Sequence, residues 1–217
     1  MTRLLDLGLN RIQNIVSEMS KLSIACVFTA IDSYEKGVVK KKEMFEWSEK
    51  LLISQDEVAD LAFELIARYQ PVATDLRYIR SCLEVSYVLS RFGGYGYEIV
   101  DILDIMGSIS DCDKKVVLDT AKMVSEMIGL GVKALEERDE HVSKRLYEMD
   151  DSVDGMYRAY LREIITAKKN SKEIYADPRC VLSALLVMRY LERLADHACY
   201  IADSARYIVT GLSGPKR

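Results

Sequence analysis

Three pairs of acidic residues are the candidates for chemistry in this sequence, because the members of each pair are four positions apart. The pairs are Asp56–Asp60, Asp150–Asp154 and Glu192–Asp196. Four residues of an α-helix advance about 400°, so the two carboxylates of a pair share one face, about 6 Å apart along the axis. A hard cation prefers such oxygen ligands. Two pairs on neighbouring helices would therefore supply four carboxylates to one metal site.

Nearby arginines offer a second explanation for the same pattern. Three of these carboxylates have an arginine three or four positions away, the pairings being Arg158 with Asp154, Arg189 with Glu192, and Arg193 with Asp196. Ion pairs at this spacing stabilise a solvated helix face without any metal. Metal binding and simple ion pairing are therefore both open from the spacing alone.

Two segments of the chain, 102 positions apart, are versions of one another. Residues 89–101 read LSRFGGYGYEIVD, and residues 191–203 read LERLADHACYIAD. The matching positions carry Leu89 and Leu191, Arg91 and Arg193, Ile99 and Ile201, and Asp101 and Asp203. The sequence therefore predicts an internal duplication.

The two copies differ at the positions that would hold a metal. The second copy carries Glu192 and Asp196, where the first copy carries Ser90 and Gly94. The first half thus keeps only the pair Asp56–Asp60 and lacks half of a four-carboxylate set. We expect that half to bind metal weakly or not at all.

The sequence around these residues predicts an all-helical scaffold. Apolar residues make up 49% of the 217 residues, and only 3 Pro and 11 Gly interrupt them. Apolar side chains recur with the period of a helix, and no segment alternates as a half-buried strand does. Predicted helices cover 4–34, 43–69, 72–106, 114–138, 140–168 and 179–210. Short connections imply antiparallel neighbours, so we expect two tandem three-helix bundles over residues 1–108 and 109–217.

Proline and glycine mark particular points along these helices. Pro71 should end the second helix, and Asp177-Pro178 combines a capping carboxylate with a proline in the first turn of the last one. Gly93, Gly94 and Gly96 lie inside the third predicted helix, where each glycine disfavours helix relative to alanine. They indicate either a kink or the close approach of another backbone.

Composition excludes several classes of protein. The net charge is −4, from 30 basic and 34 acidic residues, so a nucleic-acid-binding surface is not expected. The most apolar stretch, 22–31, is shorter than the roughly 20 residues of a membrane span, so none is expected. The cysteines are odd in number and form no CxxC motif, and we expect all five to be buried reduced thiols in a cytoplasmic protein: Cys26, Cys82, Cys112, Cys180 and Cys199.

Several segments together resemble the PhoU family. Residues 70–77 read QPVATDLR and residues 191–198 read LERLADHA, which are similar to two segments of that family. The D-x-x-x-D runs at 56–60 and 150–154 are similar to a third, and the resemblance covers essentially the whole chain. It implies two three-helix bundles side by side.

The resemblance also implies a function. PhoU proteins are regulators, not enzymes, that restrain phosphate uptake and the phosphate-starvation response with the phosphate ABC transporter and a sensor kinase. It implies a bound iron or zinc ion, with magnesium or manganese still open. The metal site would here comprise Asp150, Asp154, Glu192 and Asp196, and Asp56 and Asp60 would form a weaker one. A cytoplasmic homodimer, associated with the membrane only through a partner, is the expected form, with the transporter ATPase subunit or the sensor kinase as that partner.

Two other functions stay open at this point. One is a regulatory subunit of another ion transporter, for example a potassium transporter. The other is a metal-dependent hydrolase that uses the same acidic cluster, although no general base stands out and no nucleophile motif is readable. His197 is expected to be a packing or surface residue, and Tyr95 and Tyr97 could form a contact surface where the first half lacks its acids.

Overall fold

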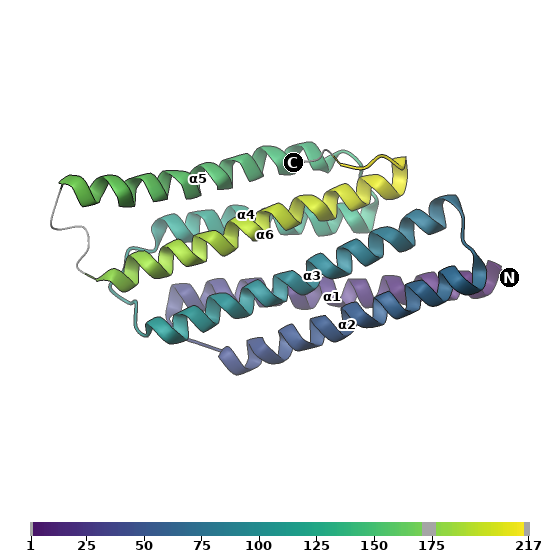
Figure 1. Cartoon of the computed structure of the whole chain (residues 1–217), viewed down its shortest axis with the longest axis horizontal. Coiled ribbons are helices and arrows are strands. Elements are labelled where there is room, and N and C mark those ends of the chain that lie inside the picture. The colour runs from purple at the N-terminus through teal and green to yellow at the C-terminus, as the bar shows by residue number, and fades with distance from the viewer. Residues whose placement is uncertain (1, 171–176, 215–217) are drawn as a thin grey trace.

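A computed structural model describes residues 2–170 and 177–214, and the side chains of residues 4–166 and 177–214. These residues form six helices and no strand (Figure 1). The helices are α1 (Thr2–Lys36), α2 (Lys41–Tyr69), α3 (Ala73–Met106), α4 (Lys115–Glu137), α5 (Val142–Asn170) and α6 (Pro178–Thr210). The predicted all-α class is confirmed, and every predicted helix end lies within two residues of the observed one.

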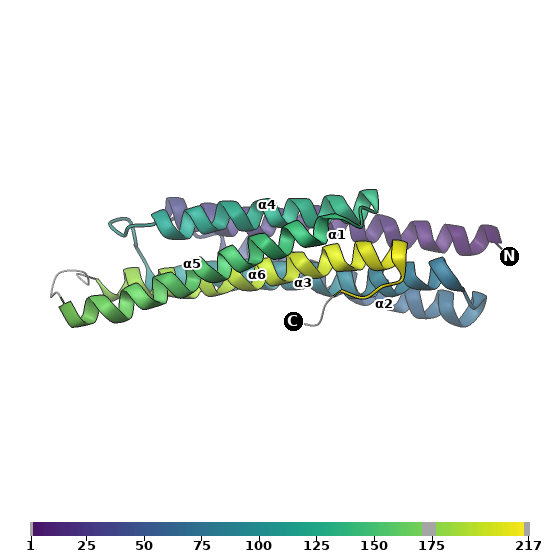
Figure 2. The same cartoon turned by 90° about the horizontal axis from the view of Figure 1, so that it is seen from above.

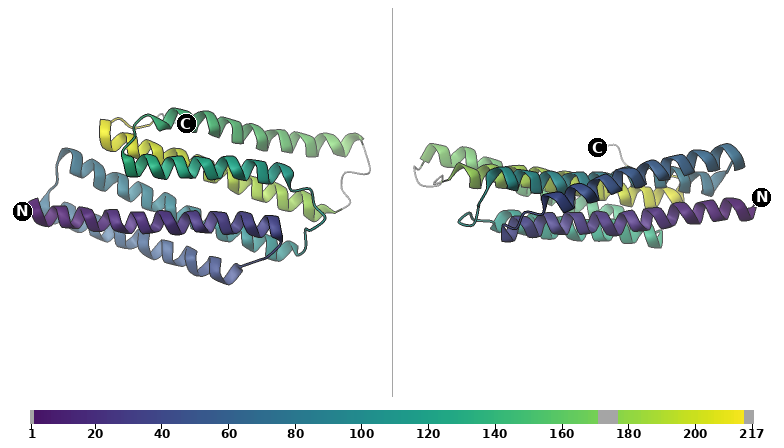
Figure 3. Two further views of the ribbon diagram at one scale, coloured as in Figure 1. Left: turned by 180° about the vertical axis from the view of Figure 1, so that it is seen from behind. Right: turned by 90° about the horizontal axis from the view of Figure 1, so that it is seen from below.

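The helices form two three-helix bundles that lie side by side along the long axis of the molecule (Figures 1 and 2). The first bundle contains α1, α2 and α3, and the second contains α4, α5 and α6. The bundles meet where α3 packs against α6 and where α1 contacts α4, the pair on the near side of Figure 3, left. In the described chain, α2 and α5 contact only helices of their own bundle. The expected domain boundary, between 108 and 109, falls in the α3–α4 connection and stays a prediction.

The helix ends have local causes that the sequence already contained. Gln70 adopts the left-handed conformation at φ 48°, and its backbone N–H bonds to the carbonyl of Ile66, which closes α2 before Pro71. At the start of α6, the Asp177 side chain accepts a hydrogen bond from the Arg179 backbone N–H at 2.9 Å, and Pro178 occupies the first turn. Both predicted boundaries are confirmed.

The glycines of α3 permit a close approach of helices. A Cβ added at Gly96 would lie 3.2 Å from the carbonyl oxygen of Cys26 on α1 and 2.9 Å from Met44 Cε on α2. A Cβ at Gly93 would lie 2.4 Å from a δ-carbon of Leu51. By contrast, Gly94 has open space around it. The predicted approach of another backbone is therefore confirmed for Gly96, whereas Gly93 makes room for the Leu51 side chain. Helix α3 runs through all three positions as one helix.

Helix α1 combines a surface face with a core face. By length and composition alone, the stretch Leu4–Lys36 is long and apolar enough to cross a membrane. The prediction that no membrane span is present rested only on the shorter apolar run at 22–31. The α1 side chains Ile12, Met19 and Tyr34 are nevertheless almost fully buried among the other helices. In this structure α1 is therefore a core element of the first bundle.

One expectation about the cysteines is wrong. Cys112 and Cys180 form a disulfide, with their Cα atoms 5.3 Å apart, although the two residues are 68 positions apart in the sequence. Spacing along the chain could not reveal this pairing, because the fold brings the α3–α4 connection back onto the first turn of α6. The other three, Cys26, Cys82 and Cys199, are buried and form no disulfide, as predicted.

Candidate functional site

The acidic residues of the second bundle lie on α5 and α6, which pack against each other. Asp154 on α5 accepts a hydrogen bond from Arg158 Nη2 at 2.5 Å, one helical turn further on. Glu192 on α6 is ion-paired with Arg189 in the preceding turn. The ion pairs that the spacing allowed are thus present for these two carboxylates.

Three of these carboxylates are close enough to influence one another. Burial raises the pKa of Glu192 above its ordinary value, and the negative charges of Asp196 and Asp154 raise it further, while Arg189 opposes the shift. The Glu192 side chain is only 16% exposed. The fold therefore brings Glu192, Asp196 and Asp154 close enough for their charges to interact.

The cluster is not arranged as a coordination shell. Among the described residues, no group of three or more His, Cys, Asp or Glu side chains is placed to hold a metal ion. Asp150 is 4% exposed, whereas Asp196 is on the surface, so the predicted ligands differ in their environment. Arginine guanidinium groups pair with Asp154 and Glu192. Metal binding by Asp150, Asp154, Glu192 and Asp196 stays a prediction.

The corresponding face of the first bundle has a different chemistry. Asp56 and Asp60 are exposed on α2 and line a shallow depression together with the ion pair of Arg11 and Glu57. On α3, the hydroxyl oxygen of Ser90 lies 2.5 Å from Gln55 Oε1. A neutral hydrogen bond thus connects α2 and α3 where the second bundle has carboxylates and arginines.

A cluster of aromatic side chains surrounds His197 at the contact between the two bundles. The ring of His197, on α6, stacks on Tyr95 of α3 with centroids 5.6 Å apart, and its Nε2 lies 3.2 Å from the Tyr95 hydroxyl. Phe92 and Tyr200 contact the same imidazole ring edge-on or tilted. Burial lowers the pKa of His197 to about 4, with further lowering from Arg91 and Arg193. His197 is therefore a neutral packing residue, as predicted.

The repeated aspartates Asp101 and Asp203 have parallel structural roles that sequence reasoning missed. Asp101 on α3 pairs with Lys41 of α2 at 2.7 Å. Asp203 on α6 accepts a hydrogen bond from the Tyr147 hydroxyl of α5. In each bundle, the repeated aspartate thus ties the last helix to the middle one. Their recurrence in the duplicated segment was the signal that could have identified them.

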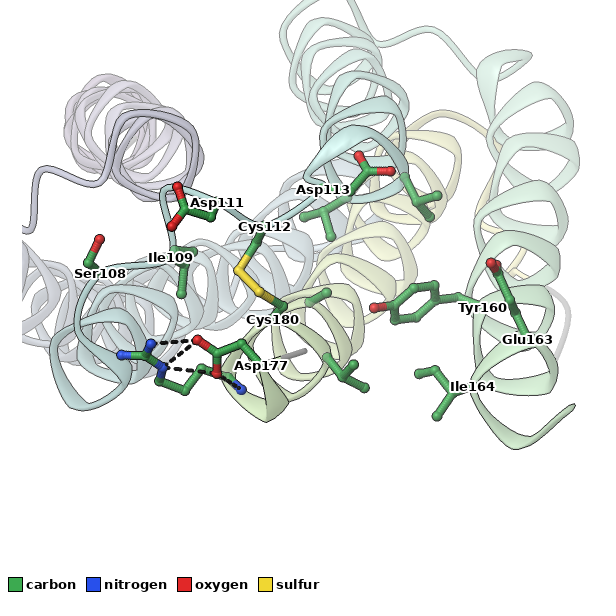
Figure 4. A pocket seen from close by; sticks show the side chains of 15 residues that line it. Ser108, Ile109, Asp111, Cys112, Asp113, Tyr160, Glu163, Ile164, Asp177 and Cys180 are labelled. Carbon is green, nitrogen blue, oxygen red and sulfur yellow. Dashed lines mark hydrogen bonds and ion pairs between the residues drawn. A yellow bond between two sulfur atoms is a disulfide. The ribbon is translucent and has the colours of Figure 1, made fainter. Parts of the chain in front are cut away.

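Two larger cavities lie outside the acidic cluster. One, of about 740 Å³, lies between α3 and α6 and is lined by side chains that include Tyr87, His197 and Tyr200. The other, of about 480 Å³, contains the disulfide and is formed by the α3–α4 connection, α4, α5 and α6 (Figure 4). Neither cavity has Asp150, Asp154, Glu192 or Asp196 among its lining residues.

Comparison with known proteins identifies one family in both halves of the chain. The family model described as "PhoU domain" matches twice, at residues 16–103 and 117–205. The chain is 26% identical over 215 residues to the phosphate-specific transport system accessory protein PhoU homolog 1 of Thermotoga maritima, a match that covers 96% of this chain and 87% of that protein. It is 30% identical over 172 residues to the PhoU homolog of Caulobacter vibrioides, covering 75% and 70% respectively.

Solved structures are similar in fold. The phosphate transport system regulatory protein PhoU from Streptococcus pneumoniae superposes with a TM-score of 0.86 at 18% identity, over 98% of this chain and all of that one. PhoU from Pseudomonas aeruginosa gives a TM-score of 0.85 at 23% identity, over 95% and 99%. The two tandem bundles are therefore a fold that this chain shares with both proteins.

Proposed function

The chain belongs to the PhoU family, and on that premise we propose that it regulates phosphate uptake and phosphate-starvation signalling by binding the phosphate ABC transporter or its sensor kinase. The observation that carries the proposal is the double family match, which leaves only short connections and ends outside the two domains. The fold supports a binding role, since helices α2 and α5 leave their outer faces uncovered by the other bundle. We place the protein in the cytoplasm as a homodimer and a negative regulator.

The test of partner binding is capture of the purified transporter ATPase subunit, and separately of the sensor kinase, by the full chain. A surface variant makes the binding test more specific. Ile53 is 68% exposed on the outer helix α2, so Ile53→Glu should weaken capture without disturbing the core. Asn14→Glu, an exposed change on α1, is the matched control. Failure to capture either protein, with or without added metal, would contradict the proposal.

We further propose that the α5–α6 acidic cluster binds a divalent metal, with iron or zinc preferred and magnesium or manganese as alternatives. Support comes from the charge cluster of Asp154, Glu192 and Asp196, because three carboxylates that repel one another favour a cation. Arg158 and Arg189 would have to turn away first. Binding that must displace these arginines should be weaker than binding to a preformed shell.

The metal proposal is tested by elemental analysis after equilibration with each metal. The double variant Glu192→Gln, Asp196→Asn removes two proposed ligands, and Asp56→Asn, Asp60→Asn is the matched control in the first bundle. We expect the first variant to lose bound metal and the control to retain it. Equal metal content in the wild type and the Glu192→Gln, Asp196→Asn variant would contradict the site.

Of the two alternative functions, neither has an observation that favours it. A metal-dependent hydrolase needs a metal with an open coordination position. In the described residues, Asp154 and Glu192 are each paired with an arginine. A regulatory subunit for another ion would share this fold, and capture experiments with the phosphate transporter proteins distinguish the two.

A further inference from the structure

The disulfide between Cys112 and Cys180 forms part of the wall of a solvent-accessible pocket. The pocket measures about 480 Å³, and both cysteines line it (Figure 4). Figure 4 shows Tyr160 and Glu163 of α5 on the opposite side of the cavity. Both cysteines are partly exposed. A small molecule can therefore reach the sulfur–sulfur bond without unfolding of either bundle.

The other cysteines are in a different situation. Cys26, Cys82 and Cys199 are buried and form no disulfide. Burial raises the pKa of both Cys26 and Cys82 to about 12, which keeps these thiols protonated and unreactive. Of the five cysteines, the two that reach solvent are the two that are paired. Among the cysteines, thiol–disulfide exchange with solutes is thus confined to Cys112 and Cys180.

Among the described residues, most of the charged side chains that line the pocket around the disulfide are acidic. Four carboxylates line it, against a single guanidinium among its lining residues in the described chain: Asp111, Asp113, Glu163 and Asp177, with Arg179. That guanidinium is already bonded to Asp177, its Nε lying 2.8 Å from Asp177 Oδ2. A concave site of one sign raises the local concentration of ions of the opposite sign. The approach to the disulfide therefore favours cations and disfavours anions.

We propose that Cys112 and Cys180 form a reversible thiol–disulfide exchange site that is selective for small thiols bearing a positive charge. In the first step, a thiolate attacks Cys112 Sγ, the Cys112–Cys180 bond breaks, and Cys180 leaves as a thiolate. In the second step, another thiolate attacks the sulfur of the small thiol bound to Cys112, so that Cys112 leaves and a small-molecule disulfide forms. Two thiols are oxidised, the protein disulfide is reduced, and the two protein thiolates take up protons.

The position of Cys180 explains the direction of attack. Cys180 lies in the first turn of α6, at the positive end of the helix dipole, which favours a thiolate. Cys112 lies in the α3–α4 connection, next to Asp111 and Asp113. The sulfur that departs first should be the one whose thiolate is better stabilised. The mixed disulfide is therefore expected on Cys112.

Reduction would release the α3–α4 connection from the start of α6. The disulfide ties this connection to the start of α6, beside the helix cap formed by Asp177. Once the bond is broken, residues 108–113 lose their covalent link to α6 and remain joined to the second bundle through the backbone that continues into α4. Disulfides in a reducing compartment are usually transient or redox-sensing, which agrees with the proposed cytoplasmic location, although the exchange chemistry does not depend on it.

The experiment measures the rate at which three small thiols, which differ in charge, reduce the disulfide of the native full-length protein. Cysteamine is cationic, 2-mercaptoethanol neutral and 2-mercaptoethanesulfonate anionic. Each rate is read by quenching with a maleimide of high mass, and is divided by the rate of the same thiol with a neutral model disulfide. We expect cysteamine to exceed 2-mercaptoethanesulfonate by about tenfold at low ionic strength. The ratio should fall towards about one in 1 M salt.

Charge variants and mass spectrometry complete the test. Asp111→Asn with Glu163→Gln should lower the ratio, and Glu18→Gln, an exposed change on α1 away from the pocket, should leave it unchanged. A trapped mixed disulfide should map to Cys112. The proposal is overturned if the normalised rates of cysteamine and 2-mercaptoethanesulfonate are equal at low salt. It is also overturned if the pair resists excess cysteamine in native buffer, or if the protein oxidised in air has five alkylatable thiols.

Discussion

At the scale of single residues, the two bundles have diverged where their chemistry would be. The second bundle concentrates carboxylates and arginines between α5 and α6, with Glu192 16% exposed and paired with Arg189. At the equivalent position the first bundle has Ser90, bonded to Gln55. The Gly94 position has room for a larger side chain. Packing therefore does not explain the loss of an acid there, and nothing else in the structure explains it.

The protonation of His197 should make the protein less stable in acid. Its pKa is about 4 in the native protein, because of burial and the nearby Arg91 and Arg193, against about 6.5 in the unfolded chain. Between these values the unfolded state binds a proton that the native state does not. The contribution of His197 is therefore complete above about pH 6.5 and decreases as the pH falls towards 4, by about 1–3 kcal/mol.

Urea unfolding of the wild type and of His197→Gln, at pH 7 and pH 4.5, measures this effect. The loss of unfolding free energy between the two pH values should be smaller in the variant. Other titrating groups are common to both proteins and cancel in the difference. An identical loss in the two proteins would show that His197 does not titrate in this way.

At the scale of helices, close approaches set which glycines are required. A Cβ at Gly131 of α4 would lie 3.0 Å from the carbonyl oxygen of Ala198 on α6, whereas Gly129, on the same helix, has nothing within 4 Å. Gly96 and Gly94 of α3 show the same contrast in the first bundle. Each bundle thus has one glycine that lets two helix backbones approach, and a neighbour that has no such role.

The α4 glycines give a matched pair of substitutions. Gly131→Ala should lower the free energy of unfolding by about 1–3 kcal/mol, because a backbone oxygen cannot move away as a side chain can. Gly129→Ala should raise it by about 0.5–1 kcal/mol, because alanine favours the helix and meets no obstacle. Thermal or urea unfolding measures both. If both variants were stabilised, the close contact of α4 and α6 would be wrong.

At the scale of the whole molecule, the two bundles share a core through α3 and α6. Buried residues of both helices belong to one continuous apolar cluster, including Leu89, Ile99, Leu191 and Ile201 from the duplicated segments. The Tyr95–His197 stack lies at the same contact. Separating the bundles would therefore expose apolar surface along the whole length of this contact.

Residues 1–108 and 109–217, expressed separately, should each unfold at a lower temperature than the full chain. The reason is the loss of the α3–α6 and α1–α4 contacts. Circular dichroism during heating measures the midpoints, and mixing the two halves should restore part of the difference. A separate half as stable as the intact protein would show that the bundles are independent.

Reduction of the Cys112–Cys180 bond should also lower stability. The bond closes a loop across 68 positions, and the chain-entropy model gives about 4 kcal/mol for such a loop, of which about 2–4 kcal/mol is commonly realised. Unfolding in urea with and without a reductant measures the change. Cys112→Ser with Cys180→Ser should match the reduced protein and no longer respond to the reductant, and a response in this variant would assign the effect elsewhere.

The sequence by itself determined the helices, because their ends depend on local chemistry. Pro71 and the Asp177-Pro178 cap fix boundaries within a few residues of chain, and apolar periodicity identifies the buried face. The duplication likewise predicted two bundles and the acidic asymmetry between them. These features depend on neighbours in sequence, so they are readable without coordinates.

Only the tertiary structure decided which distant residues meet. It paired Cys112 with Cys180, stacked Tyr95 on His197, and brought Asp154 of α5 close enough to Glu192 of α6 for their charges to interact. It also showed that a side chain at Gly96 would meet another helix, whereas one at Gly94 would meet nothing. The physical reason is that helix packing brings together side chains whose separation in sequence carries no information about their distance in space.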